Sequence, residues 1–267
     1  MDLQLKGKRA LVTGGSKGIG KAIARVLAQE GADVALLART LADLNAASAE
    51  IALETGRNVV GVVASTLDDG QVQRAVQEAI AQLGGFIDIL VNAAAEPAGF
   101  SAPPKLGEIG SAYFHVEMDT KVMGYIRTAQ AVVPGMRANG WGRIVHISGL
   151  GARNTGNTVS SMRNVAVCAL SKNMADELGP QGIQVNVVHP GTTRTERTAP
   201  LVAARAAAQG LEPAAVEQQM ASGNSIGHLV DAQEVAWVVV FLCSPKSRAI
   251  NGDVITAGGG MPRAIYY

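Results

Sequence analysis

Short apolar segments alternate with longer amphipathic segments along most of the chain. Strand-like runs of Val, Ile, Leu and Ala occur at 9–15 (RALVTGG), 32–39 (ADVALLAR), 58–65 (NVVGVVAS), 87–95 (IDILVNAAA), 142–149 (GRIVHISG), 183–191 (IQVNVVHPG) and 252–259 (GDVITAGG). Stretches of about 10–18 residues with helical spacing of apolar positions lie between most of them. Continuous apolar strands separated by helices are typical of a parallel sheet covered on both faces. The pattern predicts an α/β fold of the doubly wound type.

Residues 195–230 depart from this alternation. The segment is rich in Ala and has a helical pattern, but it lies between two predicted strands, where a short connection would be enough. We expect an inserted pair of helices that forms a lid over the carboxyl edge of the sheet and carries the substrate preference. No linker rich in Pro, Gly or Ser divides the 267 residues, so we expect a single domain over 1–267.

The charge balance argues against nucleic-acid and membrane partners. The formal net charge is +1, with 17% charged and 48% hydrophobic residues, so no strong surface field would attract a polyanion. The longest apolar runs, such as VAWVVVFL at 235–242, are much shorter than the roughly 20 residues that span a bilayer. The opening MDLQLKGKR has no apolar region of a secretory signal. We therefore expect a cytoplasmic protein.

The cysteines and histidines give no metal signal. Cys168 and Cys243 have neither CxxC nor zinc-type spacing, and both are expected to be buried thiols. The four histidines are far apart in the sequence and form no ligand pattern. No metal site is predicted.

A glycine-rich turn links the first predicted strand to the first predicted helix. In ALVTGGSKGIGKAIARVLA, at 10–28, Gly14, Gly18 and Gly20 have the spacing GxxxGxG. Glycines at such a turn let the backbone approach a diphosphate, while the helix N-terminus supplies N–H donors and the positive end of a dipole. The turn predicts a dinucleotide site; the alternative is a tight turn without a ligand.

The end of the second predicted strand indicates which dinucleotide is bound. Ala38 stands where an acidic residue would accept hydrogen bonds from the 2′-hydroxyl of the adenine ribose, and Arg39 follows it. Arg39 together with Lys17 suits a 2′-phosphate, whose charge favours two cations. We predict NADP(H) as the cofactor, with NAD(H) as the alternative. The other interpretation is that both side chains are solvated surface charges.

Four motifs, in this order, resemble those of the short-chain dehydrogenase/reductase family. TGGSKGIG at 13–20 resembles the family's TGxxxGxG turn, and IDILVNAAA resembles its DxLVNNAG strand. IQVNVVHPGTTRT at 183–195 is similar to IxVNxVxPGxxxT, and GDVITAGGG at 252–260 to the closing GxxxxxDGG. The resemblance covers nearly the whole chain. It implies a Rossmann-type sheet of seven parallel strands, with hydride transfer between a nicotinamide and a carbonyl or alcohol at its carboxyl edge.

The resemblance also implies which residues hold the cofactor. The glycine turn would bind the diphosphate and adenosine, the strand ending at Asn92 would lie beside the ribose, and residues 190–195 would lie beside the nicotinamide. Ser65 stands where the family has an Asp near the adenine, which leaves Thr66 as a backbone contact. The expected cofactor-binding residues are Gly14, Ser16, Lys17, Gly18, Ile19, Gly20, Arg39, Ser65, Thr66, Asn92, Ala93, Pro190, Gly191, Thr193 and Thr195.

The catalytic motif departs from the family pattern. The family uses a Tyr acid and a Lys in a YxxxK pair, and LSKNMADELGP at 170–180, which resembles LTKxLAxELxP, places Ser160 and Asn164 at those positions. An alkanol is a far weaker acid than a phenol, whose unperturbed pKa is about 10, so Ser160 cannot act as the usual acid unaided. The family's substrate-binding Ser falls on Gly149 in an ungapped alignment and on Ser148 after a shift of one residue; we favour Ser148.

A second departure complements the first. TAQAVVPGM at 128–136 resembles TQAVLPxM and places Lys121 where the family has a water-ordering Asn. One cation and one amide are thus retained, with their positions exchanged between two facing helices. We predict that Lys121 supplies the charge and Asn164 the amide, with a water or Ser160 relaying the proton beside Ser148. The alternative is that both positions drifted after activity was lost.

Three other residues are weighed as substitutes for the missing groups. Arg163 is one residue from Asn164 and is expected to point away from the catalytic positions, at the surface or an interface. Arg153 is expected to be a solvated loop residue, with contact to an anionic substrate as the alternative. Tyr125, four residues from Lys121 on the same helix face, is expected to pack in the core, with replacement of the missing phenol as the alternative.

Two functions of different classes follow. The first is an NADP(H)-dependent oxidoreductase with a rearranged or weakened proton path, acting on a small-molecule carbonyl or alcohol. The second is a catalytically inactive protein of the same fold that binds a dinucleotide as a sensor or scaffold. In both cases the resemblance implies a homodimer or homotetramer. We favour the enzyme.

Overall fold

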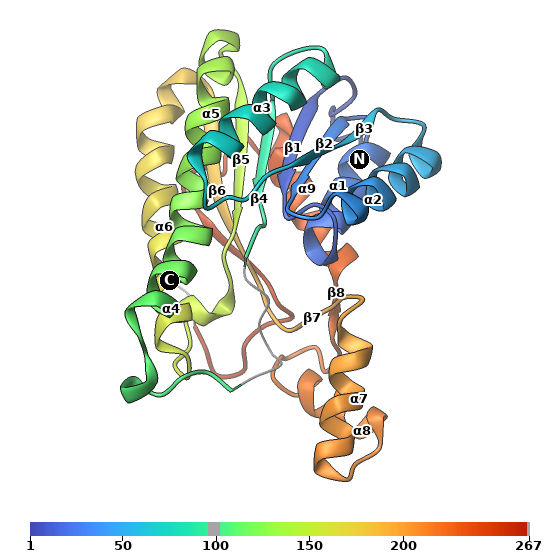
Figure 1. Cartoon of the computed structure of the whole chain (residues 1–267), viewed down its shortest axis with the longest axis vertical. Coiled ribbons are helices and arrows are strands. Elements are labelled where there is room, and N and C mark those ends of the chain that lie inside the picture. Colours follow the sequence, from blue (N-terminus) through green and yellow to red (C-terminus); the bar gives the residue numbers. More distant parts are fainter. Residues whose placement is uncertain (96–101, 266–267) are drawn as a thin grey trace.

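A parallel sheet forms the centre of the structure, a computed structural model that describes residues 1–95 and 102–265 (Figure 1). The sheet has seven strands in the order β3-β2-β1-β4-β5-β6-β9, and every neighbouring pair is parallel. The strands are β1 (Arg9–Thr13), β2 (Asp33–Ala38), β3 (Val59–Val63), β4 (Ile89–Asn92), β5 (Gly142–Ile147), β6 (Ile183–Pro190) and β9 (Val254–Ala257). Each predicted apolar segment contains one of them. The predicted Rossmann-type, doubly wound fold is confirmed.

Helices cover both faces of this sheet. One apolar core joins the sheet to α1 (Gly18–Gln29), α2 (Leu41–Thr55) and α9 (Ala232–Cys243). A second core joins the opposite face to α3 (Asp69–Leu83), α5 (Gly124–Asn139) and α6 (Thr158–Leu178). The remaining helices are α4 (Ser111–Met118), α7 (Thr198–Gln209) and α8 (Pro213–Ala221), with the turns η1 (Leu106–Glu108), η2 (Asp119–Met123), η3 (Leu150–Ala152), η4 (Gly179–Gln181) and η5 (Pro245–Ser247).

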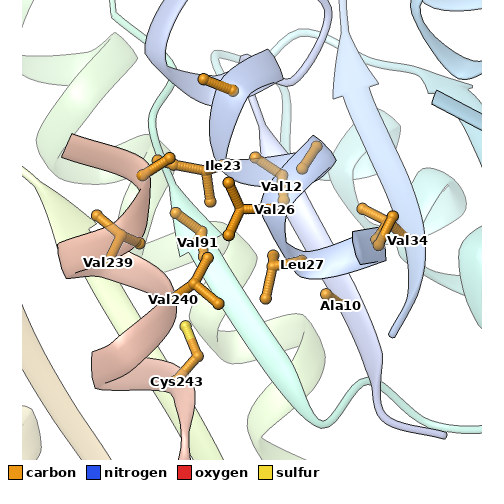
Figure 2. Close-up of a cluster of buried hydrophobic side chains, with 14 of the residues drawn as sticks. Ala10, Val12, Ile23, Val26, Leu27, Val34, Val91, Val239, Val240 and Cys243 are labelled. Carbon is orange, nitrogen blue, oxygen red and sulfur yellow. The ribbon is translucent and has the colours of Figure 1, made fainter. Parts of the chain in front are cut away.

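The first core shows why the strands are apolar along their whole length. Figure 2 shows Ile23, Val26 and Leu27 of α1 facing Val239 and Val240 of α9 above strands β1 and β4. Burying a side chain of this size contributes about 1.5–3 kcal/mol, so the two helices anchor each other and the sheet. Cys243 lies in the same cluster, and burial raises the pKa of its thiol to about 12. Cys168 on α6 is only partly buried, unlike the sequence expectation.

The position of the site follows from the strand order. β1 and β4 are neighbours in the sheet, but the chain leaves β1 for α1 on one face and reaches α5 on the other face after β4. The connections diverge there and leave a crevice outside the carboxyl ends of the two strands.

The segment between β6 and α9 contains two helices. Helices α7 and α8 lie between the short strands β7 (Thr193–Arg194) and β8 (Val230–Asp231), which pair with each other. The pair has its own small core and projects away from the central sheet (Figure 1). No helix in the described ranges has the length and apolar character needed to cross a membrane.

Candidate active site

A cleft of about 590 Å³ lies at the carboxyl edge of the sheet. Its wall is formed by the turn after β1, the ends of β2 and β5, the segments after β3, β4 and β6, and the turn η2. The predicted site residues that line it are Gly14, Ser16, Lys17, Gly18, Ile19, Gly20, Arg39, Ser65, Thr66, Ala93, Lys121, Ser148, Pro190 and Thr195. The predicted residues that lie outside the wall are Asn92, Ser160, Asn164, Gly191 and Thr193.

The turn between β1 and α1 requires glycine at two positions, because the chain folds tightly on itself. Gly14 has a φ of +66°, and an added Cβ would lie 3.0 Å from the backbone after β4. An added Cβ on Gly20 would lie 2.3 Å from the Gly14 carbonyl oxygen, so α1 could not begin so close to β1. Beside Gly18, the atoms nearest to an added Cβ belong to Thr195 and Glu196, at 3.7 and 4.0 Å. The open side of the turn therefore faces the cleft.

A carboxylate of the chain itself lies at the anion-binding position of this turn. The backbone N–H of Gly18 donates to both carboxylate oxygens of Glu196, at 3.0 and 3.2 Å. Gly18 is the first residue of α1, so its N–H is one of the free donors at the positive end of the helix dipole. Glu196 thus stands in for the diphosphate oxygens that a dinucleotide would bring to the same donors. The glycine turn fits such a group.

At the nucleotide end of the cleft, beside the glycine turn, lie the two predicted partners of a 2′-phosphate. Lys17 forms an ion pair with Asp43 of α2, with 2.7 Å between Nζ and Oδ2, and Asp43 lines the cleft as well. Arg39 lies on the wall next to the end of β2. A 2′-phosphate bound here would compete with the Asp43 carboxylate for Lys17.

Asn92 supports the wall from behind. It is fully buried, and its Oδ1 accepts hydrogen bonds from Thr13 at 3.3 Å and Thr128 at 2.8 Å. The Thr13 hydroxyl in turn accepts the backbone N–H groups of Ala93 and Ala94, at 3.1 and 3.2 Å. This network fixes the path of the chain after β4, where Ala93 and Ala94 form the wall.

Lys121 is the buried cation at the other end of the cleft. Only 3% of its surface is exposed, and its Nζ donates to the Ser148 carbonyl at 2.8 Å and to Asn164 Oδ1 at 3.0 Å. Burial lowers the pKa of Lys121 to about 7. The structure thus brings Lys121 and Asn164 into direct contact, with Lys121 on the cleft wall and Asn164 behind it.

A π-helical turn, η2, sets the position of Lys121. It connects α4 to α5, and such a turn inserts one residue into a helix and leaves backbone groups that need other partners. The Thr66 hydroxyl donates to the Thr120 carbonyl at 3.1 Å, and Arg127 Nη1 donates to Asp119 Oδ1 at 2.8 Å. These contacts hold the turn from which Lys121 reaches the cleft.

Ser148 and Gly149, the two candidates for the substrate-binding Ser position, face different atoms of Asn164. The Ser148 hydroxyl donates to the Asn164 backbone carbonyl at 3.0 Å, although Ser148 itself lines the cleft. An added Cβ on Gly149 would point at the Asn164 amide nitrogen, 3.2 Å away. The Gly149 N–H donates to Nδ1 of His189, whose pKa is lowered to about 4, chiefly by burial. His189 is therefore neutral at pH 7.

Ser160 lies in a hydrogen-bonded cluster on α6. Asn157 caps the helix by accepting the backbone N–H of Ser160 at 2.9 Å. The Ser160 hydroxyl oxygen lies 3.2 Å from Nη2 of Arg163 and 3.5 Å from Nδ2 of Asn164. Both groups are donors, so the Ser160 oxygen is the acceptor and its own proton stays available.

The expectation for Arg163 is wrong. Arg163 is buried, with 8% of its surface exposed, and it forms an ion pair with Glu117 of α4. The rotation of about 100° per residue separates Arg163 from its neighbour Asn164 on the helix. Arg163 is also three residues from Ser160, however, and this spacing places their two side chains on one helix face. Burial lowers the pKa of Arg163, and Glu117 compensates its charge.

Tyr125 is a core residue. It is fully buried, and its hydroxyl oxygen lies 2.9 Å from the Ile147 carbonyl and 3.3 Å from the Ala94 carbonyl. Burial raises the pKa of Tyr125 well above its usual value, so the phenol keeps its proton. Among the described residues, no three His, Cys, Asp or Glu side chains are placed to hold a metal ion.

Comparison with known proteins shows the family. A family model described as Enoyl-(Acyl carrier protein) reductase matches residues 14–262. The short-chain reductase protein NovJ of Streptomyces niveus is 33% identical over 254 residues, which cover 95% of this chain and 93% of NovJ. The chain belongs to the short-chain dehydrogenase/reductase family.

Two further proteins match this short-chain dehydrogenase/reductase over its length. The 3-oxoacyl-(acyl-carrier-protein) reductase FabG of Aquifex aeolicus is 32% identical over 263 residues, covering 98% of this chain and 100% of FabG. The structure of L-sorbose reductase from Gluconobacter frateurii, complexed with NADPH and L-sorbose, has a TM-score of 0.91 at 29% identity. It covers 99% of this chain and 100% of the sorbose reductase. The chain is therefore a short-chain dehydrogenase/reductase enzyme by sequence and by fold.

Sequence reasoning missed three carboxylates at the site of this short-chain dehydrogenase/reductase. Glu196 follows directly after Thr195, so the motif at 183–195 could have drawn attention to it. Asp43 lies in the first turn of α2, one turn after Arg39, and the proximity of the two charges was a usable signal. Glu117 had no signal, because its contact with Arg163 depends on how α4 packs against α6.

Proposed function

We propose that this enzyme is an NADP(H)-dependent oxidoreductase that transfers a hydride between a nicotinamide and a small carbonyl or alcohol substrate. The observation that carries the proposal is the continuity of the cleft. One cleft joins the glycine turn, where an N–H already binds a carboxylate, to the buried cation Lys121. A dinucleotide in this cleft would extend from the turn to the catalytic end.

The chain's own groups fit such a cofactor. Gly18 would donate to the diphosphate once Glu196 moves away, and Lys17 and Arg39 would meet a 2′-phosphate. Solved relatives support NADP(H): the sorbose reductase contains NADPH, and so does an actinorhodin polyketide ketoreductase with a TM-score of 0.86 at 27% identity. When bound, the nicotinamide supplies or accepts the hydride.

The proposed proton path uses the exchanged pair. Lys121 places a positive charge at the wall, and Asn164 holds it through Oδ1. The Ser160 hydroxyl, which accepts from two donors, or a water relays the proton to the substrate oxygen. Ser148 fixes the α6 backbone by donating to the Asn164 carbonyl. The path therefore needs no phenol.

The segment 195–230 is proposed to act as the lid of the single domain. Glu196, at its start, contacts the glycine turn, and Pro190 and Thr195 line the cleft before it. Helices α7 and α8 project from the body, where they can move without disturbing the sheet (Figure 1). Substrate preference would then depend on this segment.

A homodimer or homotetramer is proposed as well. On α6, Met162 and Val165 are 51% and 50% exposed, and on the neighbouring α4–η2 segment Val116 and Met123 are 45% and 42% exposed. These exposed apolar side chains lie on elements that contact one another, and a second copy would cover them. Sedimentation at several protein concentrations tests this proposal. A protein that stays monomeric at about 50 μM would contradict it.

A thermal-shift titration is the first test of the function. A dinucleotide at a hundredfold excess over its Kd adds about 2.7 kcal/mol to the free energy of unfolding. We expect the larger shift with NADPH. Arg39→Ala should weaken NADPH binding and leave NADH binding unchanged, whereas Arg74→Ala on the exposed face of α3 should change neither.

Turnover is measured next. NADPH oxidation is followed with L-sorbose and with a 3-oxoacyl thioester, and NADP⁺ reduction with a 7α-hydroxysteroid, because relatives are named for these compounds. Turnover of any of them supports the oxidoreductase. Binding without turnover of a broad carbonyl panel would favour the scaffold, for which the missing YxxxK pair is the supporting observation. Absence of any nucleotide shift would contradict both.

A further inference from the structure

Reduction of a carbonyl consumes a proton, and the catalytic end of the cleft offers few sources for it. The phenol of Tyr125 is buried between backbone carbonyls and keeps its proton. His146 and His189 are buried, and burial lowers their pKa values to about 3 and about 4, so neither carries a transferable proton at neutral pH. The Ser148 hydroxyl donates to a backbone carbonyl. The Ser160 hydroxyl is an alkanol, too weak an acid to act unaided, and burial raises the pKa of the Cys168 thiol. The source must be another group.

Lys121 has the geometry of a proton donor. Its ammonium group has three N–H bonds, and two of them point to the Ser148 carbonyl and to Asn164 Oδ1. Among the described residues no acceptor meets the third, and Lys121 lines the cleft. The other titratable groups of the wall are Lys17, Arg39, Asp43, Glu196 and Arg197. They belong to the adenosine end or to the segment that meets the glycine turn.

We infer that Lys121 is the general acid of this enzyme: the ammonium N–H that neither of its two acceptors takes delivers the proton to the substrate oxygen. The inference rests on the proposed function and deepens it. In the relay described above Lys121 is a permanent charge, whereas here it gains and loses a proton in each cycle.

The step balances in atoms and charge. In the reductive direction the carbonyl carbon receives the hydride, the C=O π pair moves to oxygen, and a new O–H bond forms there. The N–H bond of Lys121 breaks and its electron pair stays on nitrogen. The neutral amine then takes a proton from solvent. In the oxidative direction the neutral amine accepts the hydroxyl proton.

The surroundings of Lys121 allow both protonation states near neutral pH. The titratable groups that interact with it are Cys168 on α6, His146 on β5 and His189 on β6, and Arg153 after η3 interacts with Cys168 and His189. None of these is a carboxylate that would hold the ammonium charged, and burial lowers the pKa of Lys121 to about 7. The acid form is therefore present below about pH 7 and is lost above it.

Substitutions of Lys121 distinguish a proton donor from a fixed positive charge. Arginine keeps the positive charge but does not give up a proton, so Lys121→Arg should lose about 10²–10⁴-fold in kcat, as Lys121→Met should. The substrate is whichever of L-sorbose or the 3-oxoacyl thioester the parent reduces. The Kd of NADPH, measured separately, should change less than about threefold if nucleotide binding is independent of this proton. Lys172→Met, which removes an exposed lysine of α6, is the matched control and should keep the parent rate.

A pH series and a titration without substrate complete the test. The parent kcat/KM for reduction should fall tenfold per pH unit above about 7. In ¹³C-lysine NMR spectra of the free protein, one resonance should titrate near 7 and should vanish in Lys121→Met. Retention of the parent rate by Lys121→Arg, or a Lys121 resonance that titrates near 10, would overturn the acid role alone. A parent that binds no nucleotide would overturn the proposed function itself.

Discussion

The two ends of the cleft are built from different parts of the chain. At the nucleotide end, the Gly18 N–H binds an anion, and Gly14 and Gly20 are required because their neighbours leave no room for a Cβ. At the catalytic end, the groups are the side chains of Lys121, Asn164, Ser160 and Arg163.

The difference would account for an intact glycine turn beside the proposed exchange of roles at the catalytic end. A backbone N–H donor does not depend on which side chain the residue carries. The turn therefore restricts the sequence only where a side chain would not fit. A charge or an amide can be supplied from either of two facing helices, so the proposed exchange of Lys and Asn would keep the same pair of groups, whose Nζ and Oδ1 lie 3.0 Å apart. Side-chain chemistry is therefore more exchangeable in sequence than backbone geometry.

The largest expected effect comes from a methyl group at the nucleotide end. Gly20→Ala would put Cβ 2.3 Å from a backbone oxygen, which only a backbone shift can relieve, so we expect a loss of about 3 kcal/mol in unfolding free energy. The NADPH thermal shift should disappear as well. Gly149→Ala is the matched change at the catalytic end, where the nearest atom, 3.2 Å away, belongs to the side-chain amide of Asn164 rather than to the backbone. It should keep the shift, and equal damage from both variants would contradict the comparison.

Removing the ion pair between Arg163 and Glu117, behind the catalytic end, should have the next largest effect on the free energy of unfolding. Glu117→Gln leaves the buried Arg163 without a carboxylate, which should cost about 2–3 kcal/mol in urea unfolding. The exposed pair of Arg137 and Glu177 provides the control, and Glu177→Gln should change the midpoint very little. Similar effects of both substitutions would mean that burial does not strengthen the Glu117 pair.

Lys121 should make stability depend on pH. Its pKa is about 7 in the folded protein against 10.5 for a solvated lysine, so between these values the unfolded chain holds a proton that the folded chain has lost. The free energy of unfolding therefore rises with pH through this window. Relative to Lys121→Met, the parent should gain about 2–3 kcal/mol between pH 7 and 9.5. A constant difference across this range would show that burial does not perturb Lys121.

The smallest expected effect concerns the carboxylate at the glycine turn. Glu196→Gln removes a negative charge that competes with the diphosphate for the Gly18 N–H. A hydrogen bond to a charged group at an exposed site is worth about 1 kcal/mol, so the Kd for NADPH should fall about fivefold by calorimetry. Glu212→Gln, on the same projecting segment, should leave the Kd unchanged. A weaker rather than tighter complex would show that Glu196 assists binding.

Much of the fold could be predicted from the sequence. Each strand of the sheet lies inside an apolar segment, because strands covered on both faces need apolar residues throughout. The glycine spacing located the turn, and the motif order located the edge of the sheet where Lys121 and Ser148 line the cleft. The likeness of α6 to a family helix placed Ser160 and Asn164 on one helix face.

The limits of sequence reasoning are clearest around Arg163 and Lys121. The sequence predicts Arg163 at the surface or an interface, but α4 packs beside α6 and brings Glu117 to it. Nothing in the periodicity of 111–139 indicates the π-helical turn, because Thr66, which donates to its Thr120 carbonyl, is distant from this pattern of apolar positions, and Arg127, which donates to its Asp119 carbonyl, lies beyond the turn. The same turn directs Lys121 toward Asn164.

The sequence by itself determined the order of strands and helices, the positions that only glycine can occupy and the inventory of one lysine and one asparagine. Those features are local, because they depend on neighbours along the chain. The tertiary structure alone decided how deeply Lys121 is buried, which carboxylate meets Gly18 and which meets Arg163. Burial and long-range contacts set the pKa of a side chain, and they arise only when segments distant in sequence pack together.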